Sequence, residues 1–212
     1  MENMKAVQVH NYGGPEVLRF EDAPRPTPAS GELLIRVYAA SVNAIDWKAR
    51  AGYVKDYIPL PLPFIPGWDF SGIVEAVGSG VAKFKKGDEV HARPDGTRNG
   101  KGTHAEYVVV KETEAALKPK SIDHVHADAI PVVALTAWQA LFDQAGLSKG
   151  QKILIHGAAG GVGSVAVQLN GRERMSSGQR RGIIRPFYAN WELTSRSITK
   201  RPVSRTLFTM WT

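Results

Sequence analysis

The sequence predicts two architectures in succession: a small antiparallel β-barrel or sandwich, then the beginning of a doubly wound α/β domain. Two observations predict them. Short strand-like segments recur at intervals of roughly ten residues in the first part of the chain, separated by glycine and proline turns. From about residue 121 the pattern changes to helix, apolar strand, glycine loop and helix, which is how a doubly wound fold begins.

The barrel-like part contains six expected strands. They are rich in β-branched and apolar residues and lie at 6–10, 17–21, 33–38, 70–77, 89–93 and 105–110. Proline clusters before residue 33 and at 59–66 break the pattern, because proline cannot continue a ladder or a helix. Asn43 is a candidate N-cap with Asp46 in the capping-box position, which predicts a short helix over 44–51 ended by Gly52.

The second part begins with helices. Ser121 is a candidate cap for a short helix, and Pro131 opens a longer one over 132–145 that Gly146 ends. An apolar strand is expected at 152–156, and a further helix near Val162. This order places a glycine loop between a buried strand and a helix.

That loop matches a dinucleotide fingerprint with alanine in its first place. Small residues are needed there because a pyrophosphate must approach the backbone N–H groups at the start of the helix. The candidate cofactor-binding residues are Gly157, Ala158, Gly160, Gly161, Val162 and Gly163. The alternative is an ordinary turn between a strand and a helix, although the flanking elements are those that the fingerprint requires.

The composition excludes some classes of protein. The chain has no cysteine, so it can form neither disulfides nor thiolate metal sites. No apolar run reaches the roughly 20 residues of a membrane helix, and the first ten residues lack the apolar region of a signal peptide. We therefore expect a cytoplasmic protein without a membrane partner.

The net charge of +7 lies at one end of the chain. Residues 1–170 contain 18 basic and 18 acidic groups, whereas residues 171–212 contain nine basic and two acidic groups. Eight of these nine are arginines, while lysine predominates before residue 171. Because the helical pattern stops after Leu169, we expect a tail without a packed core, produced by a frameshift or truncation; a genuine basic appendage is the alternative.

Ordered motifs through about residues 5–170 resemble the zinc-independent quinone oxidoreductases of the medium-chain dehydrogenase/reductase superfamily. The motifs are Tyr12 to Leu18, Ser41-Val42-Asn43 with Asp46, Pro66 to Gly72, Gly78 to Val81, Phe84 with Gly87-Asp88, Gly102 with Ala105 to Tyr107, Leu135 to Trp138, and the glycine loop. The resemblance implies a GroES-like β-barrel at 1–125 and the start of a Rossmann-type NADP-binding domain at 126–170. It also implies an active site in the cleft between the two.

The resemblance further implies NADPH as the hydride donor and a quinone or an α,β-unsaturated carbonyl (enone) as the substrate. Full-length relatives would be homodimers. Zinc-using relatives place a cysteine early and a His-Glu pair after the Pro-Gly step, whereas this chain has Ser41 to Asn43 and Trp68-Asp69 there. No histidine pair has ligand spacing on a helix, so we expect no catalytic metal.

Three further residues are candidates for the site. Asn43 matches the family position whose amide lies beside nicotinamide or substrate, and this role is compatible with helix capping. Thr136 matches a position lining the nicotinamide, with a backbone-bonded helical threonine as the alternative. Tyr53 is a candidate catalytic phenol near the substrate, although an aromatic packed at a helix end is the more ordinary interpretation. Asp46 is expected to brace the helix start.

Three functions remain open at this point. The first is a reductase that transfers hydride from NADPH without zinc. The second is an inactive fragment, because the chain holds only one strand and part of one helix of the cofactor domain and is expected to bind NADPH weakly. The third is a nucleic-acid-binding adaptor that uses the arginine-rich tail, for which the neutral body of the chain gives no support.

Overall fold

The computed structural model describes residues 2–95 and 100–175. The chain divides into two compact units, Met1–Val132 and a second that begins at Val133. Each unit is described by itself. Most of the predicted tail, residues 176–212, lies outside the described residues.

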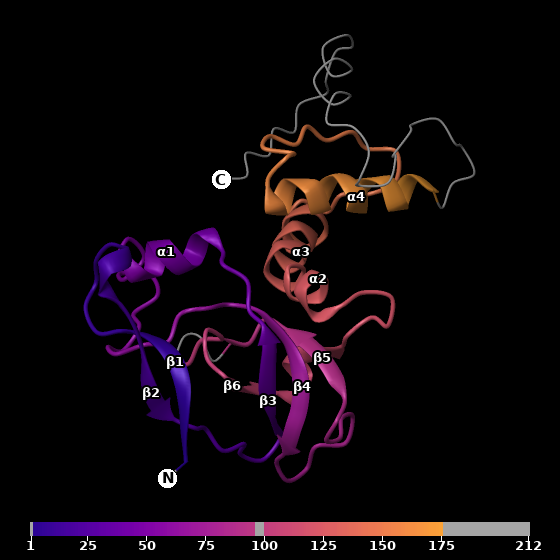
Figure 1. Ribbon diagram of the computed structural model, residues 1–212. Helices are drawn as coiled ribbons and strands as arrows, with labels where there is room; N and C mark the ends of the chain where they lie inside the picture. Colours follow the sequence, from indigo (N-terminus) through magenta and orange to yellow (C-terminus); the bar gives the residue numbers. More distant parts are fainter. Residues whose placement is uncertain (1, 96–99, 176–212) are drawn as a thin grey trace. The chain divides into compact units, whose positions relative to one another are not determined.

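The first unit contains two antiparallel sheets (Figure 1). In the smaller sheet β1 (Asn3–Val9) pairs with β2 (Leu18–Pro24). The larger sheet has the order β6-β3-β4-β5-β7. Its strands are β3 (Glu32–Ala39), β4 (Phe70–Val77), β5 (Glu89–Ala92), β6 (Tyr107–Lys111) and β7 (Ala115–Leu117). The six predicted strands are confirmed with ends shifted by a few residues; β7 was not predicted.

Alternating side chains of the larger sheet form its core. The buried residues come from four neighbouring strands, and they are Leu33, Ile35, Phe70, Val74, Val90, Ala92, Val108 and Val110. Successive residues of a strand point to opposite faces, which is why every second position is apolar. A second core cluster around Phe64 packs Val9 of β1 against Leu60 and against Ala49 of the short helix described next. Isolated bridges between Val9 and Phe64 and between Ala6 and Ala105 connect the smaller sheet to the rest of the unit.

The short helix of the first unit forms as predicted. Helix α1 (Ala44–Arg50) has Asn43 as its N-cap, and the chain leaves it through Gly52 at φ 80°. Asp46 accepts a hydrogen bond from the Asn43 backbone N–H at 2.6 Å, which confirms its role in bracing the helix start. Single 3-10 turns at η1 (Pro15–Val17) and η3 (Glu112–Glu114) complete the connections.

The next helix begins two residues later than predicted. Asp123 rather than Ser121 caps α2 (His124–Asp128), because its carboxylate accepts from the His126 backbone N–H at 2.8 Å. The longer helix α3 (Pro131–Trp138) continues into a π-helical segment, η4 (Gln139–Gln144). Gly146 follows at φ 58°, the left-handed conformation expected at a helix end.

The prediction of a strand at 152–156 is wrong for this chain. Residues 151–155 have no regular secondary structure, and none of the described residues pairs with them in a ladder. A strand of a parallel sheet is held by hydrogen bonds to neighbouring strands, so an apolar sequence alone does not form it. Helix α4 (Gly161–Met175) begins as predicted and continues past residue 170. Ala137, Leu141 and Ala166 form the buried centre of this unit, with partly buried Ile153 and Ile155 packed against them.

One segment qualifies the expectation about membranes. The consecutive helices over His124–Gln144 comprise 21 residues with a hydropathy of 1.3, which by length and composition alone would allow a membrane crossing. Core helices of soluble proteins meet the same criterion. The segment consists of α2, α3 and η4 rather than one α-helix, and it carries the buried Asp128, whose carboxylate accepts from the Ser41 N–H.

Candidate functional site

Three polar side chains of the first unit meet next to the start of α1. The Ser41 hydroxyl donates to Asp69 Oδ1, and the Asn43 amide nitrogen donates to the same oxygen at 3.1 Å and to Ser41 Oγ at 3.1 Å. Asp69 is fully buried directly before β4, while Ser41 and Asn43 lie in the segment between β3 and α1. The Asn43 side chain is therefore held by a residue 26 positions away in the sequence.

Asp46 connects the same segment to the Pro66-Gly67 turn. One carboxylate oxygen accepts from Asn43 N–H, and the other accepts from the Gly67 N–H at 2.9 Å. Gly67 has φ 100°, and a Cβ there would lie 2.3 Å from Thr103 Oγ1, so only glycine fits this approach. Thr103 in turn donates to the Asp69 carbonyl oxygen at 2.7 Å.

The backbone of Ser41 is held from two further directions. Its N–H donates to Asp128 Oδ1 of α2 at 2.9 Å, and its carbonyl oxygen lies 3.0 Å from His104 Nε2. The remaining oxygen of Asp69 accepts from the Val132 N–H at 3.3 Å. The segment that carries Asn43 is thus fixed by groups from three separate parts of the chain.

Burial sets the electrostatics of this network. It raises the pKa of Asp69, although hydrogen bonds from Ser41, the Val132 backbone and Asn43 oppose the shift. It also raises the pKa of Asp46, against backbone hydrogen bonds and the nearby His104. Burial, together with the charge of Asp69, raises the pKa of Asp128 to about 7. Three buried carboxyl groups therefore surround one short segment, and the least acidic of them changes charge near neutral pH.

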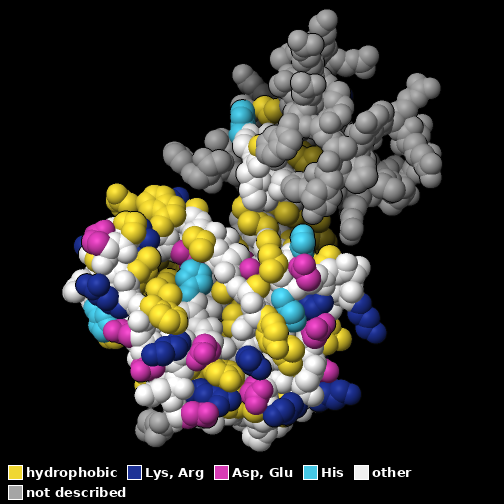
Figure 2. Space-filling view, in the orientation of Figure 1, with side chains coloured by type: hydrophobic (Ala, Val, Ile, Leu, Met, Phe, Trp, Pro, Cys, Tyr) yellow, Lys and Arg dark blue, Asp and Glu magenta, His cyan; other side chains and the backbone are white. Residues whose placement is uncertain are grey.

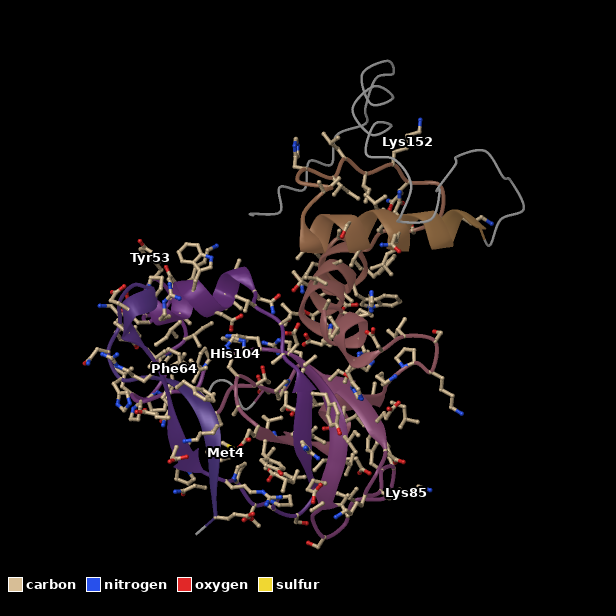
Figure 3. The ribbon with its side chains drawn as sticks, in the orientation of Figure 1. Met4, Tyr53, Phe64, Lys85, His104 and Lys152 are labelled. Carbon is tan, nitrogen blue, oxygen red and sulfur yellow. The ribbon has the colours of Figure 1, made fainter. Side chains whose placement is uncertain are left out.

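Tyr53 lies apart from this network. Its side chain is 72% exposed and packs edge-on against Trp47, with ring centroids 5.8 Å apart. Figure 3 shows Tyr53 on the outer side of α1 and His104 on its inner side. Val42, Trp47 and Tyr57 are also exposed, and Figure 2 shows hydrophobic side chains gathered over α1. Tyr53 therefore makes the ring contact expected of an aromatic residue packed at a helix end, and it is largely exposed to solvent.

The glycine loop has the close backbone approach that its sequence predicts. Gly157 adopts φ 65°, and Gly160 N–H donates to the Gly157 carbonyl oxygen at 2.9 Å. A Cβ at Gly163 would lie 2.1 Å from that same oxygen, so a side chain cannot be accommodated there. The loop leads directly into α4, where the Ser164 N–H donates to the Gly160 carbonyl oxygen at 2.9 Å. The N–H groups that precede it at the start of a helix have no intrahelical acceptor.

The remaining candidates of the loop have different environments. Val162 contributes to the apolar cluster of the second unit, Ala158 is half-buried, and Gly161 faces Val133 at the start of that unit. Thr136 is exposed on α3. The structure therefore brings Asn43 together with Ser41 and Asp69 in the first unit, and it places Thr136 and the loop in the second.

Metal ligands are sparse in the described part of the chain. Among residues 2–95 and 100–175, no group of three or more histidine, aspartate or glutamate side chains is arranged to hold a metal ion. Ser41, Asn43 and Asp69 bond to one another. Trp68, in the same motif as Asp69, is buried and lies beneath the Arg93 guanidinium, 5.4 Å from the ring centroid.

Sequence reasoning missed part of this site. Asp128 and His104 received no role, because they lie far from Asn43 in the sequence and belong to no recognised motif. Asp69 was noted as part of the Pro66 to Gly72 motif and as a departure from the zinc pattern, but it was given no role in binding Asn43. The sequence does contain an indication of the role of Asp69. This residue lies between Trp68 and the apolar strand that follows, and a carboxylate buried there requires hydrogen-bond donors.

Comparison with known proteins agrees with this geometry. Residues 29–120 match the alcohol dehydrogenase GroES-like domain. The chain is 41% identical over 172 residues to a chloroplast envelope quinone oxidoreductase homolog of Arabidopsis thaliana, covering 78% of this chain and 52% of that protein. The predicted resemblance to the quinone oxidoreductases of the medium-chain dehydrogenase/reductase superfamily is therefore confirmed. The predicted fold class is thereby confirmed.

Two further similarities are informative. A 2-methylene-furan-3-one reductase of Solanum lycopersicum is 41% identical over 172 residues, which are 78% of this chain and 44% of that protein. A mycobacterial protein solved in complex with NADPH superposes with a TM-score of 0.70 at 36% identity, covering 80% of this chain and 49% of that one. The chain spans about half the length of the relatives it matches.

Proposed function

We propose that this chain is the barrel and the beginning of the cofactor domain of an NADPH-dependent reductase that acts on quinones or enones without zinc. The observation that carries the proposal is the glycine loop. Its chain path brings the Gly157 carbonyl oxygen so close to Gly163 that only glycine fits, and it leads into the start of α4, where the first N–H groups lack intrahelical acceptors. A pyrophosphate needs this combination of close backbone approach and unpaired N–H groups.

The residues present fit NADPH at that loop. The backbone N–H groups of Gly161, Val162 and Gly163 would hold the pyrophosphate, and the α4 dipole would favour its charge. The candidates for the nicotinamide end are Thr136 in the second unit and Asn43 in the first. When bound, the cofactor supplies a hydride. A quinone or enone spreads the resulting negative charge over its own conjugated system, which removes the need for a metal Lewis acid.

The exposed rings beside α1 suit a flat, apolar substrate. Trp47, Tyr53 and Tyr57 together offer aromatic faces at the surface of the first unit. A conjugated carbonyl compound would stack on such rings. Tyr53 is the proposed proton donor because its exposed phenol can recover a proton from water, although its contact in the described chain is with Trp47 and it lies apart from Asn43.

The partners follow from this assignment. A small-molecule quinone or enone is the substrate, and the whole enzyme is a homodimer in the cytoplasm. Binding of nucleic acid through residues 171–212 is not part of the proposal, because those residues lie mainly outside the described part of the chain.

Nuclear magnetic resonance of the 15N-labelled 212-residue chain tests the proposal even where affinity is low. Titration with millimolar NADPH is expected to shift the backbone amides of Gly157 to Gly163 and the side-chain amide of Asn43. Replacing Gly163 with alanine should weaken the NADPH affinity reported by the loop amides about tenfold or more, since a loss of about 1.4 kcal/mol of binding free energy suffices. The matched control is Gly150→Asn, because Gly150 has φ 89° and open space around it and asparagine tolerates that conformation.

The same preparations are then mixed with a quinone or an enone, and NADPH oxidation is followed by absorbance. A chain in which the loop amides stay unmoved by millimolar NADPH would not be a cofactor-binding protein. Loop shifts without turnover would instead retain the cofactor site and remove the catalytic part of the proposal.

A further inference from the structure

The Asp69 carboxylate determines which edge of the Asn43 amide faces inward. Asp69 is fully buried, and its Oδ1 receives both the Ser41 hydroxyl and the Asn43 amide nitrogen. A carboxylate is an acceptor only, so it attracts the NH₂ edge of an amide and repels the carbonyl edge. The bond is charge-assisted and therefore stronger than a neutral one.

The rest of the segment is fixed independently of Asp69. Asp46 bonds the Asn43 backbone N–H, and Asp128 and His104 hold the two sides of the Ser41 backbone. What these contacts do not determine is the rotation of the Asn43 carboxamide about its last bond. The contacts from Asn43 Nδ2 to Asp69 and Ser41 determine this rotation, and the capping box places the same side chain beside the Asp46 backbone N–H.

We propose that Asp69 is a positioning residue for Asn43: it holds the amide nitrogen inward, so that the carbonyl oxygen of Asn43 is the atom presented to a ligand. Asn43 is half-buried, so part of the residue is accessible from solvent. The group recognised is consequently a hydrogen-bond donor, of which the primary carboxamide of a nicotinamide is the example. This inference rests on the proposed function for the identity of the ligand.

The first test concerns the protein without ligand. The side-chain 15N resonance of Asn43 is identified by its absence from the spectrum of Asn43→Asp. In the wild type its amide protons should exchange with deuterium about tenfold or more slowly than those of a free asparagine side chain, because the bonded conformation must open first. Exchange at the free rate would overturn the proposal without any variant.

Asp69→Asn supplies the second test. The new amide is neutral and has one acceptor oxygen for the three donors that the Asp69 carboxylate serves, so its bond to Asn43 is weakened and the Asn43 amide can rotate more often. The Asn43 resonances should then shift and lose their protection. Asp128→Asn is the matched control, because Asp128 is equally a buried carboxyl in this network but bonds only the Ser41 backbone; the Asn43 side-chain signals should stay protected there. Equal behaviour of the two variants would contradict a specific role for Asp69.

The ligand arm uses NADPH and its 3-acetylpyridine analogue, whose acetyl group accepts but cannot donate a hydrogen bond. The wild type should prefer NADPH by about fivefold, the value of one net hydrogen bond, and Asp69→Asn should lose most of that preference. An unchanged preference in the variant would overturn the proposal. If neither compound binds the wild type, the cofactor assignment fails, whereas the exchange measurements still decide whether Asp69 orients Asn43.

Discussion

The two candidate binding regions of this chain are built in opposite ways. The Asn43 network is made of side chains that meet from distant parts of the sequence, since Ser41, Asp69 and Asp128 are contributed by a loop, the residue before a strand and a helix. The glycine loop consists almost entirely of backbone within seven residues, from Gly157 to Gly163. A backbone site requires that side chains be absent at particular positions. A side-chain site requires that folding bring together residues that are distant in the sequence.

The surroundings differ in the same sense. The first unit closes two sheets around several buried clusters. In the second unit, three buried residues are accompanied by partly buried ones, and the apolar segment 151–155 pairs with no strand of the described chain. We expect the side-chain network to be rigid and the loop to open more readily.

Core truncations should give the largest contrast between the units. Phe64 is 1% exposed, and Phe64→Ala should lower the free energy of unfolding by about 3–5 kcal/mol because a large cavity remains. Leu141→Ala in the second unit should cost about 2 kcal/mol, since its partly exposed neighbours can relax into the space. Urea denaturation monitored by circular dichroism measures both. Phe20→Ala, at a side chain 74% exposed, is the control and should change little. A larger cost for Leu141 than for Phe64 would reverse the comparison.

The pH dependence of stability should come from the network rather than from the loop. The folded protein holds a proton on Asp128 up to about pH 7, whereas the unfolded chain releases it near 3.8. The folded state therefore binds more protons between these values, and stability decreases as the pH rises through this window. Between pH 5 and 8 we expect a loss of about 2 kcal/mol.

Asp128→Asn should reduce that loss and stabilise the protein at pH 8, because the amide oxygen can still accept from Ser41 N–H without a charge beside Asp69. Denaturation curves at several pH values, with Asp123→Asn as an exposed control carboxyl, give the comparison. A variant with the same pH slope as the wild type would show that Asp128 is already ionised at pH 5.

Tyr53 separates packing from chemistry. Tyr53→Phe keeps the ring against Trp47, so the free energy of unfolding should change by less than about 0.5 kcal/mol. A phenol that donates a proton to the substrate would nevertheless lower kcat for quinone reduction by about a hundredfold. Steady-state kinetics and thermal melts of the same preparation report the two quantities. An unchanged kcat would show that Tyr53 contributes its ring contact with Trp47 and no proton transfer.

Metal removal should have the smallest effect. Because Ser41, Asn43 and Asp69 satisfy one another by hydrogen bonds, dialysis against a chelator should leave the melting temperature unchanged. Elemental analysis should find no stoichiometric zinc in the purified chain. One zinc per chain that survives chelation would contradict the zinc-free assignment.

Local patterns allowed much of this molecule to be predicted. The alternation at Leu33 and Ile35, the cap at Asn43 and the spacing of Gly157, Gly160 and Gly163 are each contained in a few consecutive residues. The strand at 152–156 failed because a parallel strand depends on partners that no local pattern supplies. The roles of Asp128 and His104 could not be predicted from the sequence for the same reason, since both roles depend on contacts with Ser41 that form on folding.

The shared oxygen of Asp69 has a consequence for how such sequences change over evolutionary time. Ser41 and Asn43 both donate to it, so an exchange at position 69 alone would leave two donors without their acceptor. Substitutions at positions 41, 43 and 69 should therefore be tolerated mainly when they occur together. Among homologous sequences these three columns should covary, and a lineage that acquires a metal ligand at one of them should have altered the other two as well.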